Sequence, residues 1–93
     1  MADNFRITSH RKEDGLHFHL TGNFDGTAAM ELIYTIAEHN ASAQRIFIET
    51  DGLNVLLPFG RQVFLKRLSL IPAVCQKVMF TGKHGRKLNL SEN

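Results

Sequence analysis

The sequence has almost no cysteine, the residue on which covalent cross-links and many metal sites depend. Its 93 residues include only Cys75, so no disulfide bond can form within the chain and no cysteine-based zinc site is available. Cys75 is flanked by Val74 and Val78, and we interpret it as a core thiol rather than a nucleophile. A single thiol fits a reducing compartment.

Long apolar runs are also missing. The segment Met1 to Asn4 does not have the apolar character of a secretory signal. No apolar run approaches the roughly 20 residues that a membrane-spanning helix needs. We therefore expect a cytoplasmic protein without membrane contact.

A strong excess of charge of one sign is the third absence. Eleven lysines and arginines stand against nine acidic residues, which gives a formal net charge of +2. We interpret the basic residues as solvated helix and tail faces, since a nucleic-acid footprint needs a denser stripe with exposed aromatics. With 43% apolar and 22% charged residues, residues 1–93 are expected to fold as one ordered domain.

Patterns of catalytic residues are absent as well. The glycines Gly22, Gly26 and Gly52 do not form the phosphate-binding pattern GxxxxGK[ST]. Asp25 has no nucleophile or second acid at a recognisable spacing, so a helix cap is its expected role. We expect a protein that is not an enzyme and that has no cofactor.

Histidine supplies the one candidate metal site. His17 and His19 lie two residues apart on one face of a predicted strand, with His10 across the predicted hairpin. Imidazoles in this arrangement can bind zinc, copper or nickel. No acidic residue or cysteine is evident to complete the site, so a polar sheet face is the preferred interpretation.

Hydrophobic periodicity predicts an α/β domain with the element order β-β-α-β-α-β. The first two strands are expected to form an antiparallel hairpin across the turn Asp14-Gly15. Because later strands follow helices, the sheet is expected to be mixed and four-stranded, with both helices on one face. The expected strands are 5–8, 16–21, 45–50 and 77–81, and the expected helices are 27–39 and 61–68.

The segment before the second predicted helix carries the largest apolar cluster expected in a loop. Residues 53–57 are predicted to form the loop, Pro58 to Gly60 a sharp break, and Pro72 the end or a kink of the helix. Leu56, Leu57 and Phe59 either fold inward as core or form an exposed contact surface. An exposed Phe59 would favour the contact surface.

Two stretches resemble the STAS domain, a family named for sulfate transporters and anti-sigma factor antagonists. The stretch from Leu20 to Asp25 is similar to the family's strand that ends in Gly-Glu-Leu-Asp before its first helix. The stretch from Ile46 to Leu65 aligns without a gap to the family's strand, apolar loop, Asp-Ser-Ser-Gly motif and second helix, with Gly60 at the motif glycine. Together with the last strand, the resemblance covers most of the chain and implies a small STAS-like fold.

The sequence departs from the family at the motif itself. Phe59 stands where the family has a serine that a partner kinase phosphorylates, and Leu57 and Pro58 replace the preceding Asp and Ser. A phenyl ring has no hydroxyl group, so the switch that adds roughly −1.5 to −2 charge is lost. The family's C-terminal helix is expected to be absent or reduced, because only Gly82 to Asn93 remains.

The resemblance implies a bacterial regulatory module that binds a protein partner, such as a kinase-like anti-sigma factor or a signalling complex. Without the serine, binding is expected to be constitutive or controlled by another route. The start of the first helix and the N-terminus of the second would form the contact surface. The expected partner-binding residues are Asp25, Thr27, Leu57, Phe59, Gly60 and Arg61.

Two alternatives remain open. A small-molecule or lipid sensor of the same fold would use a cavity between sheet and helices, and an enzyme or metal protein would use His17 and His19. A homodimer through the edge of the first strand is a further possibility. The side chains that would line the cavity are Phe24, Phe47, Phe64 and Phe80.

Overall fold

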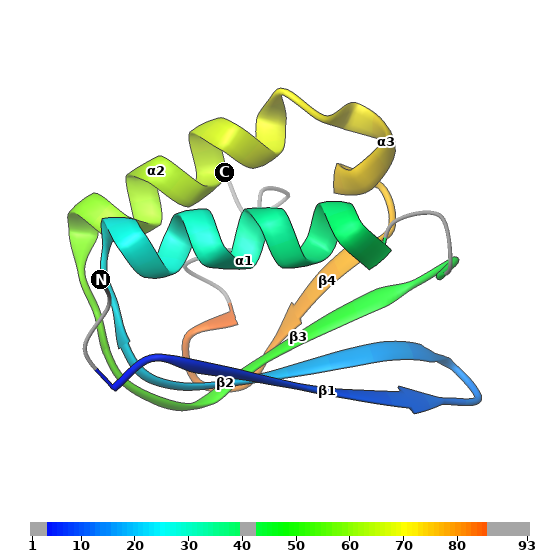
Figure 1. The fold of residues 1–93 in the computed structure, drawn as a ribbon, viewed down its shortest axis with the longest axis horizontal. Helices are drawn as coiled ribbons and strands as arrows, with labels where there is room; N and C mark the ends of the chain where they lie inside the picture. Colours follow the sequence, from blue (N-terminus) through cyan, green and yellow to red (C-terminus); the bar gives the residue numbers. More distant parts are fainter. Residues whose placement is uncertain (1–3, 40–42, 86–93) are drawn as a thin grey trace.

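The computed structural model describes residues 4–39 and 43–85 of the chain (Figure 1). These residues form an α/β domain that consists of one sheet and one layer of helices. The observed order differs from the predicted one only by an additional short helix before the last strand. The elements are β1 (Arg6–Lys12), β2 (Gly15–Phe24), α1 (Gly26–His39), β3 (Ile46–Leu56), α2 (Pro58–Ser69), α3 (Pro72–Cys75) and β4 (Val78–Thr81).

The four strands form one mixed sheet in the order β1-β2-β3-β4. β1 and β2 pair antiparallel, which confirms the predicted hairpin and places His10 opposite His17. β3 runs parallel to β2, and β4 runs parallel to β3. Each parallel step needs a connection that crosses the sheet, and the helices supply it. The predicted mixed four-stranded sheet is confirmed.

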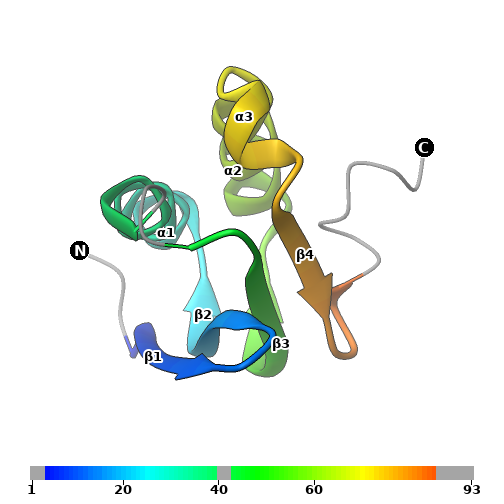
Figure 2. The same cartoon turned by 90° about the vertical axis from the view of Figure 1, so that its right-hand side faces the viewer.

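The helices cover one face of the sheet, as predicted, with α1 and α2 side by side (Figure 2). Strand periodicity decides which face this is, because successive side chains of a strand point to opposite faces. Along β2 the side chains alternate between buried and half-buried. The buried side chains of β2 and β3 that meet the helices include Leu16, Phe18, Leu20, Phe24, Ile46 and Ile48.

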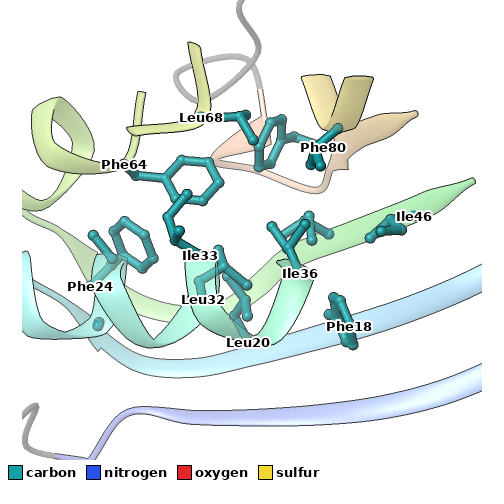
Figure 3. Packing of buried hydrophobic residues seen from close by; sticks show 14 of the residues in the cluster. Phe18, Leu20, Phe24, Leu32, Ile33, Ile36, Ile46, Phe64, Leu68 and Phe80 are labelled. Atoms are coloured by element: carbon teal, nitrogen blue, oxygen red, sulfur yellow. The ribbon is translucent and has the colours of Figure 1, made fainter. Parts of the chain in front are cut away.

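Aromatic rings hold the helix layer to the sheet (Figure 3). Phe64 of α2 packs edge-on against Phe24 of β2, with ring centroids 5.9 Å apart, and against Phe80 of β4 at 5.5 Å. Edge-to-face pairs of this kind add to the stabilisation that burial alone gives. The three rings therefore fix α2 over the sheet near the middle of the helix.

Two segments predicted as breaks or loops belong to strands. β2 continues through Gly22 to Phe24, and β3 continues beyond Thr50 to Leu56, so the predicted loop 53–57 is mostly strand. The pairing of β2 with β3 contains two register shifts, which interrupt the alternation of apolar and polar residues. The alternation of apolar and polar residues is therefore lost from the sequence in segments where β2 and β3 are still paired.

The prolines open helices rather than ending them. α2 begins at Pro58, three residues before the predicted start, because proline lacks the amide hydrogen that is unpaired in a first helical turn anyway. α2 ends at Ser69, and Pro72 then opens the four-residue helix α3. The predicted absence of a full C-terminal helix concerns 82–93, of which 86–93 lie outside the described residues.

In the described part of the chain, none of the helices has the length and apolar character required to cross a membrane.

Candidate protein-binding surface

Asp25 stands at the junction of β2 and α1 and caps the helix, as the sequence predicts. Its Oδ1 atom accepts a hydrogen bond from the backbone amide of Ala28 at 2.8 Å. The carbonyl oxygen of Asp25 accepts the amide of Ala29 at 2.9 Å, which is the first hydrogen bond of α1. A side-chain oxygen in this position satisfies an amide that the helix itself cannot pair. One carboxylate oxygen is thus committed to the fold.

The starts of α1 and α2 meet because β2 and β3 run parallel and end together. Phe24 pairs with Leu56 at the ends of the two strands, and the amide of Leu57 donates to the Phe24 carbonyl at 3.1 Å. Gly60, in the first turn of α2, is buried against this junction. A Cβ atom at Gly60 would lie 2.6 Å from the Phe24 carbonyl oxygen. Gly60 therefore sets the approach of the helices and offers no exposed contact.

Phe59 lies at the surface where the two helix starts meet. Its side chain is 69% exposed, and Leu57 before it is 41% exposed. The Phe59 ring lies over Gly26, since a Cβ atom there would come within 2.9 Å of ring carbon Cε2. Leu57 and Phe59 of the apolar cluster are thus turned outward, whereas Leu56 is half-buried and packs against the core. An exposed aromatic side chain supported by backbone is a frequent anchor of protein interfaces.

A shallow hollow of about 530 Å³ lies between α1 and α2 beside this ring. Asp25, Thr27 and Phe59 of the predicted site line it. The amide of Arg61 donates to the Leu57 carbonyl at 3.0 Å within α2, and neither residue lines the hollow. The remaining lining residues, which the sequence reasoning missed, are Gly26, Met30, Val63 and Arg67.

The missed residues lie at helical spacing from predicted ones. Met30 follows Thr27 by three positions, and Val63 and Arg67 follow Phe59 by four and eight. Residues separated by three or four positions share one face of a helix. Extending the predicted contact stripe along each helix would have found them. Val63 is half-buried and also packs against the core to which Phe64 and Leu68 of the same helix belong.

Apart from the surface around Phe59, a cluster of charged side chains lies on the sheet face opposite the helices. His17 is only 12% exposed, and both of its ring nitrogens face carboxylates: Nδ1 is 2.7 Å from Glu49 Oε2, and Nε2 is 2.8 Å from Asp14 Oδ1. The His17 ring stacks on Phe47, with centroids 4.6 Å apart. Phe47 is half-buried, and the His17 ring covers part of it.

This geometry favours the protonated, cationic form of His17. Ionised carboxylates only accept hydrogen bonds, so both ring nitrogens must carry protons to bond to Asp14 and Glu49. The hydrogen bond to Asp14, followed by that to Glu49, raises the pKa of His17 above its ordinary value of 6.5. The hydrogen bond from His17 lowers the pKa of Asp14 and of Glu49. The group stabilises the sheet as a charged triad.

The same contacts argue against His17 as a metal ligand, because each of its ring nitrogens already faces a carboxylate oxygen. His19 lies beside the triad, with Nδ1 3.5 Å from Glu49 Oε1. Across residues 4–39 and 43–85, no cluster of three or more histidine, cysteine, aspartate or glutamate side chains could hold a metal ion. The sequence reasoning missed Asp14, which contacts His17, and Glu49, which contacts both histidines.

The four phenylalanines proposed to line a ligand cavity do not share one. Inside the core, Phe64 packs against both Phe24 and Phe80. Phe47 contacts His17 on the opposite face of the sheet.

Cys75, which was expected in the core, is half-buried. Burial raises the pKa of its thiol. The thiol donates a hydrogen bond to the Leu68 carbonyl at 3.0 Å. These contacts are those of structural residues.

No protein-family model matches the chain, and a search of curated proteins finds no significant match. The function is therefore inferred from the geometry of the surface around Phe59.

Proposed function

We propose that this chain is a non-enzymatic protein-interaction module that docks a partner through the surface at the starts of α1 and α2. The observation that carries the proposal is the position of Phe59, which is 69% exposed and lies over Gly26. Leaving a phenyl ring in water is unfavourable unless another apolar surface covers it. The hollow beside Phe59 gives the apolar surface of a partner a defined site to fill.

The resemblance to STAS domains supports a regulatory role of the anti-sigma factor antagonist kind. The observed α/β order with helices on one face fits such a domain, and Phe59 stands at the place of the family's phosphorylated serine. A phenyl ring cannot accept a phosphoryl group. We therefore propose that the partner is bound without serine phosphorylation at this position, in the cytoplasm of a bacterium.

The proposed partner is a protein, such as a kinase-like anti-sigma factor or a signalling complex. Phe59 and the apolar side chains beside it would supply most of the affinity, because buried aromatic anchors dominate interfaces. Thr27 and Asp25 would lie at the polar side of the contact. Gly60 and Arg61 would act through the placement of α2 rather than through the hollow itself.

The test is capture of partners from the native host with wild-type protein, Phe59→Asp and Met79→Asp. Met79 is the matched control, because it is 51% exposed and lies on β4, away from the helix starts. We expect one protein that wild type and Met79→Asp hold and that Phe59→Asp loses. Equal capture by all three proteins would refute the proposed surface.

The alternative of a lipid or small-molecule sensor predicts a different result. Native mass spectrometry of the purified protein would then show a bound molecule whose occupancy does not depend on Phe59.

A homodimer through β1 is a further arrangement to test by light scattering. Antiparallel self-pairing of β1 would bring its cations together, since Arg6–Lys12 contains three basic residues and no carboxylate.

A further inference from the structure

The hollow beside Phe59 continues along α2. A second hollow of about 380 Å³ is lined by Val63, Lys66, Arg67 and Leu70, and it shares Val63 and Arg67 with the first. The two together form one groove, here called the helical groove, which runs along α2. α1 lines only its first part, through Gly26, Thr27 and Met30. Leu70, at its far end, is 69% exposed, as Phe59 is at the near end.

The spacing of the groove residues defines its length. Phe59, Val63, Arg67 and Leu70 follow one another at intervals of four, four and three residues. This places the first three on one stripe of α2 and Leu70 directly after the end of the helix. At 1.5 Å per residue, the groove spans about 16 Å from Phe59 to Leu70, or three helical turns. This length suits a helical segment of about ten to twelve residues.

The groove has an apolar end and a positive end. Phe59, Val63 and Met30 form the apolar part. Lys66 and Arg67 line the other part, and α2 from Pro58 to Ser69 contains no acidic residue. Within the described residues, no carboxylate lies at ion-pair distance from Lys66 or Arg67. Both cations lie in the last turn of α2, where the negative end of the helix dipole favours positive charge. Their charges remain available to a partner.

The walls of the groove also decide which backbone conformation fits it. Beyond the first turn of each helix the amides and carbonyls are paired internally, so the groove from Val63 to Arg67 offers an incoming chain almost no backbone partners. An extended peptide would leave its own amides and carbonyls without hydrogen bonds at the interface. A helix satisfies its own backbone and presents only side chains, and apolar residues at i, i+4 and i+7 suit such a groove.

We propose that the helical groove docks an amphipathic helix of the partner, with apolar residues against Met30, Phe59 and Val63 and acidic residues over Lys66 and Arg67. The proposal rests on the proposed function, since it names the chemistry of the partner at the same surface. It adds residues that the simpler contact at Phe59 does not require: Lys66, Arg67 and Leu70.

The experiment is a selection from a displayed library of 16-residue peptides built on a helical framework, with the full chain as the target. Binding of the enriched peptides is then measured for wild type and for Lys66→Glu/Arg67→Glu. Lys83→Glu is the control for a change of charge elsewhere, because Lys83 is exposed and lies after β4. Circular dichroism establishes that each variant is folded.

We expect enriched peptides with apolar residues at i, i+4 and i+7 and with aspartate or glutamate on the flank. Their affinity should fall at least tenfold for Lys66→Glu/Arg67→Glu and stay unchanged for Lys83→Glu. Replacing the acidic peptide residues by lysine should restore binding to the double variant. This exchange of charges separates a direct contact from a change in folding.

Three results would overturn the inference: no enriched peptide, enrichment without acidic residues, or equal binding to wild type and the double variant. The proposed function would survive any of them if Phe59→Asp still lost a partner captured from the host. If the peptide selection failed and Phe59→Asp also captured the same proteins as wild type, both the helical groove and the proposed function would be refuted.

Discussion

The ring of Phe59 lies against the backbone of Gly26, so close that a Cβ atom on Gly26 would come within 2.9 Å of Cε2. The first residue of α1 thereby supports the exposed aromatic residue of α2. Gly26 has no positive φ angle, so its conformation alone does not require glycine. The space under the Phe59 ring does, and this makes the two residues one unit of the proposed surface.

Replacing Gly26 by alanine should therefore weaken partner binding more than it weakens the fold. The added methyl group pushes away the end of a side chain that is free to turn, while alanine is a better helix former than glycine. We expect the free energy of unfolding to change by less than about 1 kcal/mol and partner capture to fall severalfold. Urea unfolding and quantitative pull-down measure the two effects. Unchanged capture would show that the position of the ring is irrelevant.

Gly60→Ala should have the opposite balance, because its new methyl group meets backbone. The Cβ atom would lie 2.6 Å from the Phe24 carbonyl oxygen and 2.7 Å from the Asp25 carbonyl carbon, neither of which can turn aside. We expect a loss of about 1–3 kcal/mol in the free energy of unfolding, the usual cost of overpacking. Gln62→Ala, an exposed change on the same helix, is the control in the same urea titration. Equal stability of both variants would contradict the close approach.

Sequence periodicity recovers the order of the large elements because each has a continuous apolar pattern. α1 is the clearest case, with Ala29, Leu32 and Ile36 buried at helical spacing. The pattern fails where tertiary pairing replaces it: β3 continues to Leu56 although its pairing with β2 is shifted twice. Such irregularities depend on the partner strand, and the sequence of one strand does not contain them.

The cap at Asp25 and the contact between His17 and Glu49 differ in the same way. Asp25 is local: its carboxylate and the Ala28 amide that it caps are three residues apart, so a capping pattern reveals it. Glu49 contacts His17 from a different strand, 32 residues away. Only the parallel register of β2 and β3, which pairs His19 with Glu49, brings that carboxylate to the histidines.

The cap at Asp25 predicts a separation of stability from binding. Asp25→Ala should lower the free energy of unfolding by about 1 kcal/mol, because the Ala28 amide loses its partner. Asp25→Ser should restore most of that loss, since a serine oxygen caps a helix nearly as well. If Asp25 also contacts the partner with its charge, the serine variant will be stable and yet bind less tightly. Thermal unfolding and pull-down of both variants, side by side, distinguish the two roles.

The charged triad of His17, Asp14 and Glu49 predicts how stability depends on pH. The raised pKa of His17 means that its stabilisation is complete below the ordinary value of 6.5 and is lost as pH rises through the raised pKa. The lowered pKa of Glu49 means that its stabilisation is complete above 4.5 and is lost as pH falls through the lowered pKa. The triad therefore stabilises the fold most between pH 4.5 and 6.5.

His17→Gln should remove this dependence, because glutamine carries no charge at any pH. Urea midpoints measured from pH 4 to pH 9 should converge for wild type and variant at alkaline pH, where wild-type His17 is neutral. Between pH 4.5 and 6.5 the wild type should be clearly the more stable protein. His10→Gln is the matched control, since His10 is exposed on β1 directly opposite His17. A constant difference between wild type and His17→Gln over the whole range would show that His17 acts through packing on Phe47 and not through its charge.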